Sequence, residues 1–557
     1  MKMTGAQIII ETLIELGVTD VFGYPGGQAI NIYEALYEKR DRIRHYLAAH
    51  EQGAAHAADG HFRASGKVGV VFATSGPGAT NLVTGIATAM LDSVPMLAIT
   101  GNVPRSLIGK DSFQEIDITG ITLPITKHNY FINDIASLAD SIREAYRIAR
   151  SGRPGPVLID VPKDIQMAQY DYEPQPIAPK FDNLHAAQAD IALAAKMIDE
   201  SERPYLYIGG GAIGAGIADE IAAFADKTDA VIGCSLMGIS AVSTDCPRFL
   251  GMQGMHGRYA SSMAQHNADL IVAIGVRFSD RATGNTAKYA TKAKIIHIDI
   301  DFSEIRKNIG ISLGIVGDVK DTFERIAALV QGGKRPKWMQ FVDTLKETEA
   351  SSAPQPDAMV PRNVLACINK AVTDDTVIAT DVGQHQMWAA QYCRFNKTRK
   401  FVSSGGLGTM GFGMGAAIGA AVAAKERVVL ITGDGSFGMN LNELATAVSY
   451  RTPLTIVLMN NGVLGMVRQW QTLFFKQHYS ATTLGRKTDF VKLAEAFGAQ
   501  GYRVSSIAEF EEVFQKAFAV DGPVLIECPI DKDEFVLPML PPGGSMDDII
   551  TKAEVAK

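Results

Sequence analysis

Short apolar runs alternate with stretches of helical periodicity along almost the whole chain. The segments "VGVVFATSGPGATNLVTGIATAM", "ADLIVAIGVRF" and "RVVLITGDG" each contain a continuous apolar run and a glycine-rich or polar turn. Such runs are typical of strands buried on both faces, and strands separated by helices form parallel sheets. The pattern predicts an α/β protein made of doubly wound parallel sheets.

Two stretches rich in proline and polar residues interrupt this alternation, and we expect linkers there. They predict domains of ordinary size: a first domain at 1–165, a linker at 166–185, a central domain at 186–331, a second linker at 332–360, a third domain at 361–530 and a tail at 531–557. The first and third domains each begin with a helical stretch and carry a glycine-rich strand end near the middle. That likeness leaves a distant duplication open.

Composition and charge narrow the classes of partner. The chain of 557 residues has a formal net charge of −7 and no run of five basic residues, so neither nucleic acid nor a membrane is expected as a partner. Its five cysteines are scattered outside any C-x-x-C pattern, which predicts neither a disulfide framework nor a zinc site. Glu11 and Glu15 interrupt the N-terminal apolar pattern at helical spacing, unlike the apolar centre of a signal peptide. We expect a cytoplasmic protein.

Polar residues follow two predicted strands of the third domain, and in open α/β sheets ligands bind at such strand ends. Asp434 follows "RVVLI", while Asn460 and Asn461 follow "PLTIVLM". Carboxylate, amide and backbone carbonyl oxygens, the last from Val463, are ligands that Mg²⁺ prefers and often shares with phosphates. Because one aspartate cannot neutralise a dication, the pattern predicts a diphosphate as the missing ligand, with Gly435 letting the backbone approach it.

The first domain also offers polar and glycine-rich strand ends. "VFGYPGG" and "VVFATSGPGATN" place loops after predicted strands, and Glu51 lies where a strand meets a helix. A carboxylate in the first turn of a helix is usually only a favourable charge at the helix dipole, and turn glycines are common. Taken alone, these features leave a structural and a functional interpretation open.

The central domain carries a glycine-rich turn, "YLYIGGGAIGAG", in which Gly209, Gly211 and Gly214 satisfy G-x-G-x-x-G after a strand. A nicotinamide dinucleotide site should have an acidic residue at the end of the next strand. The next apolar run, "AVIGCSLMG", ends instead in Cys234 and Ser235. A dehydrogenase function is therefore not favoured.

The Gly-Asp-Gly and Asn-Asn pair resembles the signature of thiamin-diphosphate enzymes, and further motifs extend the resemblance over nearly the whole chain. These motifs are "YPGG", "HEQGAAHAADG", "ATSGPGATN", "DSFQE", "SGRPGPVLIDVPKD", "MHG", "RFSDRATG", "DVGQHQMWAAQ", "GGLGTMGFG" and "LGMVRQW". Together they resemble the catalytic large subunits of acetohydroxyacid synthase, also called acetolactate synthase. The resemblance implies thiamin diphosphate, Mg²⁺ and FAD as cofactors. It also implies a homodimer or homotetramer with active sites between subunits, and a small regulatory subunit as a candidate partner.

The resemblance implies roles for individual residues around thiamin diphosphate. Asp434, Asn461 and the carbonyl of Val463 would hold Mg²⁺. Met410 would wedge between the two cofactor rings, and the carbonyl of Gly408 would accept the exocyclic amino group. The other implied contacts with this cofactor are Tyr24, Pro25, Gly26, Gly27, Pro77, Asn81, Val382, Gly383, Gln384, His385, Gly435 and Ser436.

Glu51 is implied to be the activating carboxylate, which reaches the pyrimidine ring from the facing subunit. A carboxylate shielded from water can share a proton with a ring nitrogen and so help the cofactor to remove its own C2 proton. A second 2-keto acid needs a cation for its carboxylate and an apolar wall for its alkyl group. The implied catalytic and pocket residues are Phe113, Gln114, Lys163, Met255, Arg281, Met466 and Trp470. Without the resemblance, Met466 and Trp470 are equally well explained as core residues on one helix face.

The implied FAD site lies in the central domain, on the glycine-rich turn and on later strand ends. Its residues are Arg153, Gly209, Gly210, Gly211, Ser235, Leu236, Met237, Met255, His256, Gly275, Arg277, Asp280, Arg281, Asp299, Ile300, Asp318 and Val319. Taken alone, His256 and His385 are equally well explained as buried structural histidines.

The implied function is that of an acetohydroxyacid synthase, an enzyme of branched-chain amino acid biosynthesis. Such an enzyme decarboxylates pyruvate on thiamin diphosphate and joins the remaining two-carbon unit to a second 2-keto acid. Pyruvate as acceptor gives 2-acetolactate, and 2-ketobutyrate gives 2-aceto-2-hydroxybutyrate. The alternatives are a FAD-dependent pyruvate oxidase, another thiamin-diphosphate 2-keto acid decarboxylase, and a catalytically silent binding protein of the same fold. Glu51 together with an intact metal motif argues against the last.

Overall fold

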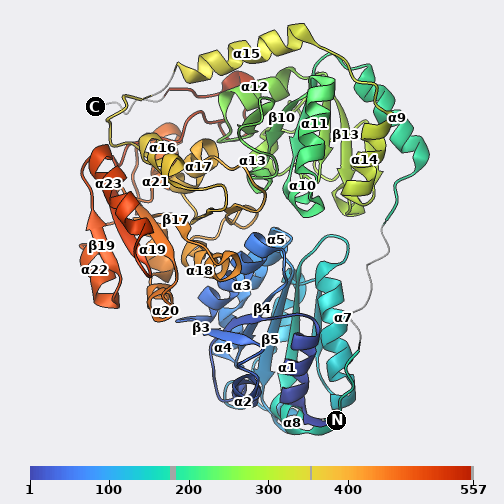
Figure 1. Ribbon diagram of the computed structural model, residues 1–557, viewed down its shortest axis with the longest axis vertical. Coiled ribbons are helices and arrows are strands. Elements are labelled where there is room, and N and C mark those ends of the chain that lie inside the picture. The colour runs from blue at the N-terminus through green and yellow to red at the C-terminus, as the bar shows by residue number, and fades with distance from the viewer. Residues whose placement is uncertain (176–183, 352–353, 553–557) are drawn as a thin grey trace.

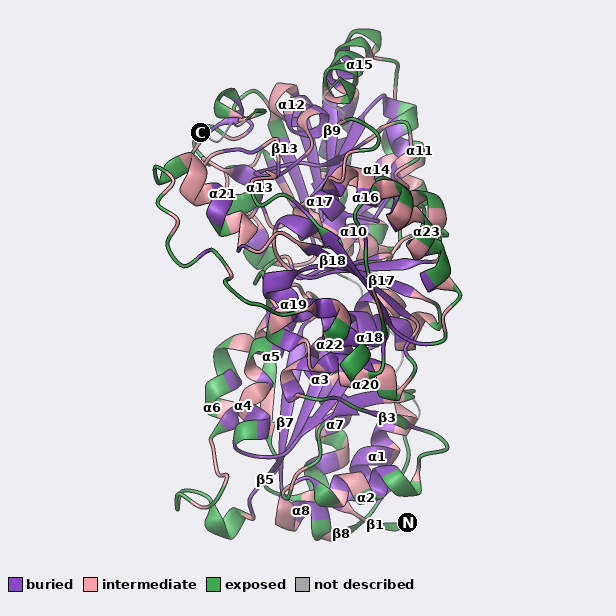
Figure 2. Ribbon diagram, turned by 90° about the vertical axis from the view of Figure 1, so that its left-hand side faces the viewer, coloured by how far each residue is buried: buried purple, intermediate pink, exposed green. Residues whose placement is uncertain are grey.

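The computed structural model describes residues 1–175, 184–351 and 354–552, which form three units (Figure 1). Each unit is built on a six-stranded sheet in which neighbouring strands are parallel, and we call them the first, central and third units in chain order. Figure 2 shows the buried strands at the centre of each unit, with helices outside them. The predicted α/β class and doubly wound parallel sheets are confirmed.

The first and third sheets have the same topology. The first runs β3-β2-β4-β5-β7-β6 and the third β16-β15-β17-β18-β20-β19, so both have the order 2-1-3-4-6-5 when strands are counted along the chain. The strands of the first sheet are β2 (Asp20–Gly23), β3 (Arg44–Leu47), β4 (Gly69–Ala73), β5 (Met96–Asn102), β6 (His128–Phe131) and β7 (Pro156–Pro162). Those of the third are β15 (Val377–Thr380), β16 (Phe401–Val402), β17 (Val428–Gly433), β18 (Leu454–Asn460), β19 (Gln500–Arg503) and β20 (Val524–Pro529). This shared order is what a distant duplication would leave.

The central sheet is wound differently. It runs β11-β10-β9-β12-β13-β14, which is the order 3-2-1-4-5-6 along the chain. In that topology ligands bind in the crevice where the strand order reverses, between the first and fourth strands. The strands are β9 (Pro204–Ile208), β10 (Val231–Cys234), β11 (Phe249–Met252), β12 (Leu270–Ile274), β13 (Lys294–Asp299) and β14 (Leu313–Val316). The crevice therefore lies beyond the ends of β9 and β12.

Some secondary structure lies in the two stretches expected to be linkers. In 166–185, β8 (Gln169–Asp171) pairs antiparallel with β1 (Lys2–Thr4), whereas residues 176–183 lie outside the described residues. In 332–360, α15 (Pro336–Ala350) was not expected, and it packs on α12 (Tyr259–Asn267) of the central unit. Within the described ranges, no helix is both long enough and apolar enough to cross a membrane.

Helix α3 (Glu51–Ser65) of the first unit packs along α18 (Phe412–Ala424) of the third unit (Figure 1). Their backbones touch, because a Cβ on Gly60 would lie 2.1 Å from the carbonyl oxygen of Ala416, and one on Gly419 would lie 1.8 Å from that of Ala57. Only glycine fits at such an approach. The contact fixes α3, and with it Glu51, against the third unit.

Candidate active site

The ends of β17 and β18 bring the predicted metal ligands together. Gly433 pairs with Met459 in the parallel ladder, so Asp434, the first residue of α19 (Asp434–Asn440), lies beside the end of β18. Burial raises the pKa of the Asp434 carboxyl to about 6, although backbone N–H groups of Gly435 and Asn461 next to it oppose the shift. A bound cation would restore the ionised form. Asp434 and Asn461 therefore share one site.

The two asparagines of the Asn-Asn motif have different surroundings. Asn460 donates from Nδ2 to Oε1 of Glu527 at 2.7 Å, which ties it to the neighbouring strand. Asn461 instead donates to Oε1 of Gln384 at 3.2 Å, and its Oδ1 accepts from the backbone N–H of Val463 at 3.2 Å. Among the residues that the structure describes, no three carboxylate, imidazole or thiol side chains gather as a metal-ligand cluster. An ion beside Asp434 would need phosphate or water to complete its shell.

His385 lies in the crevice between the ends of β15 and β17, on α17 (Gln384–Tyr392). A Cβ on Gly433 would lie 2.8 Å from its Nδ1, so the glycine before Asp434 makes room for the imidazole. Burial lowers the pKa of His385 to about 3, and its Nε2 has no hydrogen-bond partner. A neutral imidazole with one unused nitrogen can donate a hydrogen bond to a phosphate oxygen. The residues present fit Mg²⁺ with a diphosphate.

Met410 and Gly408 lie on the segment that connects β16 to α18. The methyl group of Met410 lies 3.9 Å from the position that a Cβ on Gly435 would take, so it reaches the start of α19. Gly408 has open surroundings, with only Val382 at 4.0 Å from such a position. The remaining residues implied to bind the diphosphate follow β15 or β17: Val382, Gly383, Gln384, Gly435 and Ser436.

Asp381 organises this crevice and was not expected from the sequence. Its buried carboxylate accepts from the backbone N–H groups of Val382 at 3.1 Å and Gly411 at 2.8 Å. It thereby ties the end of β15 to the residue after Met410. Its position directly after an apolar strand, like that of Asp434, is the signal that could have identified it.

Glu51 is the first residue of α3, and its side chain is only 9% exposed. Asn81 donates from Nδ2 to Oε2 of Glu51 at 2.9 Å. Glu443 on α20 (Glu443–Ser449) accepts from the backbone N–H groups of Ala49 and His50 at 3.2 and 3.0 Å. Glu443 therefore holds the turn that presents Glu51. It was not expected, because a glutamate in a first helical turn looks like an ordinary dipole charge.

The other residues predicted in the first unit surround the ends of β2, β4 and β7. Lys163 donates from Nζ to the carbonyl of Gly27 at 3.0 Å, which fixes the loop of Tyr24, Pro25, Gly26 and Gly27. A Cβ on Gly76 would lie 2.9 Å from the carbonyl oxygen of Gln114, so this residue packs on the loop that begins α4 (Pro77–Asn81). Phe113 is 83% exposed.

Arg281, Met255 and Trp470 come together at the edge of the central and third units. The Arg281 guanidinium carbon lies 5.7 Å from the centre of the Trp470 ring, and Nη1 lies 3.8 Å from Sδ of Met255. The tail packs against one side of this group, because Leu540 and Met546 form an apolar cluster with Met255, against which Trp470 packs, while the Arg281 side chain is 64% exposed. A cation beside an apolar wall is what a 2-keto acid requires. The part played by the tail was not expected.

Two further residues predicted for the site, Met466 and His256, differ in their surroundings. Met466, one turn before Trp470 on α21 (Gly465–Phe474), packs against the large core shared by the central and third units. His256 is buried, and burial together with the nearby Arg281 charge lowers its pKa to about 4. Its Nδ1 has no hydrogen-bond partner. Met466 therefore contacts this core with part of its side chain, and His256 keeps one nitrogen for a ligand.

The glycine-rich turn of the central unit packs against the loop after β12. A Cβ on Gly209 would lie 2.1 Å from the carbonyl oxygen of Gly275, and one on Gly211 would lie 2.7 Å from its Cα. These glycines are needed for the two strand ends to approach each other, whether or not a ligand binds. The motif thus has a packing role that does not depend on a ligand.

The charged residues around this turn indicate a ligand more specifically than the glycines do. Among the described residues, none forms a hydrogen bond or ion pair with the half-buried Arg277 guanidinium, and burial lowers its pKa. Arg153 in contrast bonds Glu304 at 2.6 Å and Ser93 at 2.8 Å. Asp318 caps α14 (Val319–Leu329). An unpaired, partly buried cation at the reversal of strand order fits an anionic group such as a dinucleotide diphosphate.

The remaining residues of the implied FAD site follow strand ends of the central unit. Burial raises the pKa of Asp299, at the end of β13, to about 6. The others lie directly after β9, β10 and β13 or on the short helices that follow the strands: Gly210, Ser235, Leu236, Met237, Asp280, Ile300 and Val319.

Comparison with known proteins identifies the family. Models of thiamine pyrophosphate enzymes match three parts of the chain: the N-terminal TPP binding domain at 3–121, the central domain at 191–326 and the C-terminal TPP binding domain at 381–528. The probable acetolactate synthase large subunit of Methanocaldococcus jannaschii is 45% identical over 99% of this chain and 96% of its own length. The acetolactate synthase isozyme 2 large subunit of Escherichia coli is 43% identical over 99% of this chain and 100% of its own. The large subunit from Corynebacterium glutamicum is 43% identical, covering 98% and 90%.

Each matched model covers most of the strands of one sheet, and the relatives align over 98–99% of this chain. The chain therefore belongs to the thiamin-diphosphate-dependent enzymes and, within them, to the acetolactate synthase large subunits.

Proposed function

We propose that this chain is the catalytic subunit of an acetohydroxyacid synthase that joins two 2-keto acids with loss of carbon dioxide. Two pyruvates would give 2-acetolactate, and pyruvate with 2-ketobutyrate would give 2-aceto-2-hydroxybutyrate. The observation that carries the proposal beyond cofactor binding is the group of Arg281, Met255 and Trp470. A decarboxylase has no acceptor to hold, whereas a synthase needs a cation and an apolar wall for one.

Each of the following residues would have one role in binding or activating thiamin diphosphate. Thiamin diphosphate, when bound, supplies the electron sink that lets a 2-keto acid lose carbon dioxide. Asp434, Asn461 and Val463 would hold Mg²⁺, and His385 would donate to the diphosphate. Glu51, shielded from water and bonded to Asn81, would hold a proton at the pyrimidine ring.

The acceptor would be bound by two further groups. Arg281 would pair with its carboxylate, and Trp470 would contact its alkyl group. The tail residues Leu540 and Met546 pack behind Met255 and exclude water from that side.

We further propose FAD in the central unit, supported by the crevice between β9 and β12 and by the unpaired Arg277. Acetohydroxyacid formation has no net redox change, so this FAD would not be consumed. A homodimer or homotetramer is supported by the 83% exposure of Phe113, a large apolar side chain that a neighbouring subunit would cover. A small regulatory subunit is supported by the words "large subunit" in the names of the relatives.

The test is to incubate the purified chain with pyruvate, thiamin diphosphate, Mg²⁺ and FAD and to identify the products. We expect 2-acetolactate, and 2-aceto-2-hydroxybutyrate once 2-ketobutyrate is added. Acetaldehyde as the main product would make the protein a decarboxylase. Hydrogen peroxide with consumption of oxygen would make it an oxidase. Omission of Mg²⁺ is the control, since activity should then be lost.

A further inference from the structure

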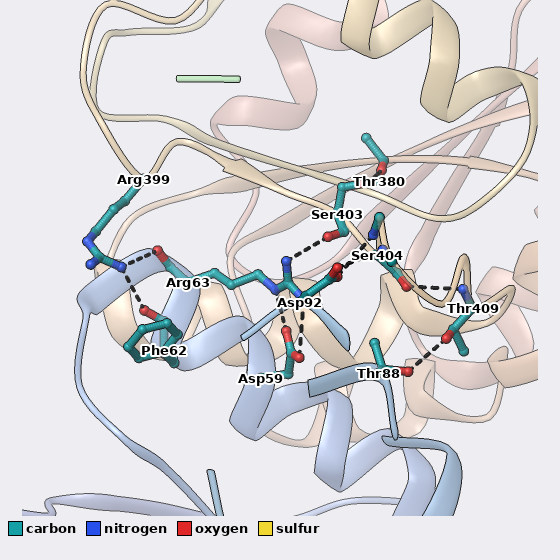
Figure 3. Close-up of polar contacts among 12 residues, drawn as sticks. Asp59, Phe62, Arg63, Thr88, Asp92, Thr380, Arg399, Ser403, Ser404 and Thr409 are labelled. Carbon is teal, nitrogen blue, oxygen red and sulfur yellow. Dashed lines mark hydrogen bonds and ion pairs between the residues drawn. The ribbon is translucent and has the colours of Figure 1, made fainter. Parts of the chain in front are cut away.

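A buried polar network joins the first and third units at Arg63 on α3 (Figure 3). The Arg63 side chain is 7% exposed. It donates from Nε to Asp59, from Nη2 to Oδ2 of Asp92 at 2.9 Å and from Nη1 to the carbonyl of Ser403 at 2.8 Å. All three nitrogens of the guanidinium are thus engaged, and one bond crosses to the third unit.

Asp92 provides two more bonds across the same boundary. Its Oδ2 accepts from the backbone N–H of Gly405 at 3.0 Å, and its Oδ1 accepts from that of Gly406 at 2.6 Å. Asp59 already neutralises Arg63 within α3, so Asp92 is a second carboxylate facing one guanidinium. The negative charge of Asp92, which Arg63 does not fully neutralise, is offset by the two peptide N–H groups that donate to it. Asp92 is therefore arranged to hold the backbone of residues 405 and 406.

Residues of the central unit also lie at this contact between the first and third units. A Cβ on Gly405 would lie 2.4 Å from Sδ of Met237, and one on Gly406 would lie 3.0 Å from Nη2 of Arg277. The two glycines thus fit between Asp92 and the central unit with no space for a side chain. This place is where all three units meet.

The same segment is held again at its far end. Thr409 donates from its backbone N–H to Oγ of Ser404 at 3.1 Å, and its hydroxyl lies 2.7 Å from that of Thr88 on α5 (Val83–Leu91). In the sequence, Gly408 lies between these two anchors, and Met410 follows the second. The surroundings of Gly408 are open, so its position depends on the anchors.

We propose that Arg63 and Asp92 are positioning residues for thiamin diphosphate. They set the path of residues 403–410, and through it the carbonyl of Gly408 and the side chain of Met410. The inference rests on the proposed function, in which these two groups contact the cofactor. Loss of the Asp92 carboxylate would leave the N–H groups of Gly405 and Gly406 and the buried Arg63 guanidinium with fewer partners, and the segment would move to satisfy them.

The experiment compares Asp92→Asn with Asp521→Asn, because Asp521 also pairs with an arginine, Arg451, but at an exposed position. The dissociation constant of thiamin diphosphate is measured by calorimetry at saturating Mg²⁺ without pyruvate, and exchange of the cofactor C2 proton is followed by NMR. We expect Asp92→Asn to raise the dissociation constant by about tenfold or more and to slow the exchange. Asp521→Asn should match the wild type in both measurements.

A lower unfolding temperature with normal cofactor affinity and normal exchange in Asp92→Asn would make the network purely structural and overturn the proposal. If Asp92→Asn does not fold, Thr88→Val tests the other anchor, with Thr88→Ser as the variant that keeps the hydroxyl. Thr88→Val should weaken cofactor binding and Thr88→Ser should restore it; equal affinities would overturn the proposal. Absence of acetolactate from the wild type would defeat the proposed function but leave these binding measurements unaffected.

Discussion

The strand ends of the third and central units carry similar sequence signals, but the glycines in them have different neighbours. Before Asp434, Gly433 makes room for the imidazole of His385, which keeps a nitrogen without a partner. In the central unit, Gly209 and Gly211 make room for the backbone of Gly275 and, at Gly209, also for the apolar side chain of Val276. A glycine-rich turn therefore indicates a ligand site when the space it leaves is used by a polar side chain. When backbone fills the space, the turn is explained by packing.

The largest effect is expected at the third unit. Asp434→Ala should abolish Mg²⁺-dependent binding of thiamin diphosphate, because the ion loses its one anionic protein ligand. Calorimetry with and without Mg²⁺ measures this. Asp375→Asn is the control, since Asp375 is a half-exposed residue of the same unit whose carboxylate pairs with Lys397 and Lys400. If Asp434→Ala binds thiamin diphosphate as tightly as the wild type does, the turn of the third unit is not a metal site. It would then no longer differ in function from the turn of the central unit.

A large effect is also expected at Glu51. Glu51→Gln keeps an oxygen that can accept from Asn81, so cofactor binding should persist. Turnover should fall by about two to four orders of magnitude, the range for loss of a positioned acid or base. The measurements are the rate of acetolactate formation and the exchange of the cofactor C2 proton. A near-normal exchange rate would show that Glu51 is only a first-turn charge.

Substitutions in the glycine-rich turn of the central unit should change the stability of the protein. Gly211→Ala should destabilise the protein by about 1–3 kcal/mol, the usual result of overpacking, because the new methyl group would meet Gly275. Gly214→Ala is the matched control, since its Cβ would have no neighbour within 4 Å, and it should be neutral or stabilising by about 0.4–1 kcal/mol. Thermal unfolding separates the two variants, and thiamin diphosphate affinity should be normal in both. Equal unfolding temperatures would contradict the packing explanation.

The smallest effect concerns the choice of acceptor. Trp470→Leu should leave acetolactate formation largely intact and lower the preference for 2-ketobutyrate over pyruvate by about tenfold, as expected when contact with one methylene is lost. A competition assay with both acceptors measures the product ratio. Phe474→Leu is the control, because this ring packs on Trp470 from the same helix at 5.8 Å. A wild-type ratio in Trp470→Leu would make the indole a core residue.

The sheets and the metal-ligand pair could be predicted because their signals are local. Buried strands appear as apolar runs, and the residue after a strand reaches the ligand edge of its sheet, as Asp434 and Asn461 do. Helix α15 was not expected, because proline and polar residues flank it and hide the spacing of its buried residues Trp338, Val342 and Leu345.

The supporting residues could not be predicted for a different reason. Glu443 acts on a turn that lies 393 residues earlier in the chain, and Asp92 acts on a segment 313 residues later. Neither residue differs locally from an ordinary surface carboxylate. Only the packing of α3 on α18 brings such pairs together, and no periodicity in the sequence encodes it.

The backbone contact between α3 and α18 also has a consequence for synthesis of the protein. Arg63 and its partner Ser403 are 340 residues apart. At a translation rate of about 5–20 residues per second, roughly 20 to 70 seconds separate their emergence from the ribosome. Throughout that time the small-residue face of α3 is complete but has no helix to cover it. Each nascent chain must therefore keep this face from other polypeptides until α18 has been made.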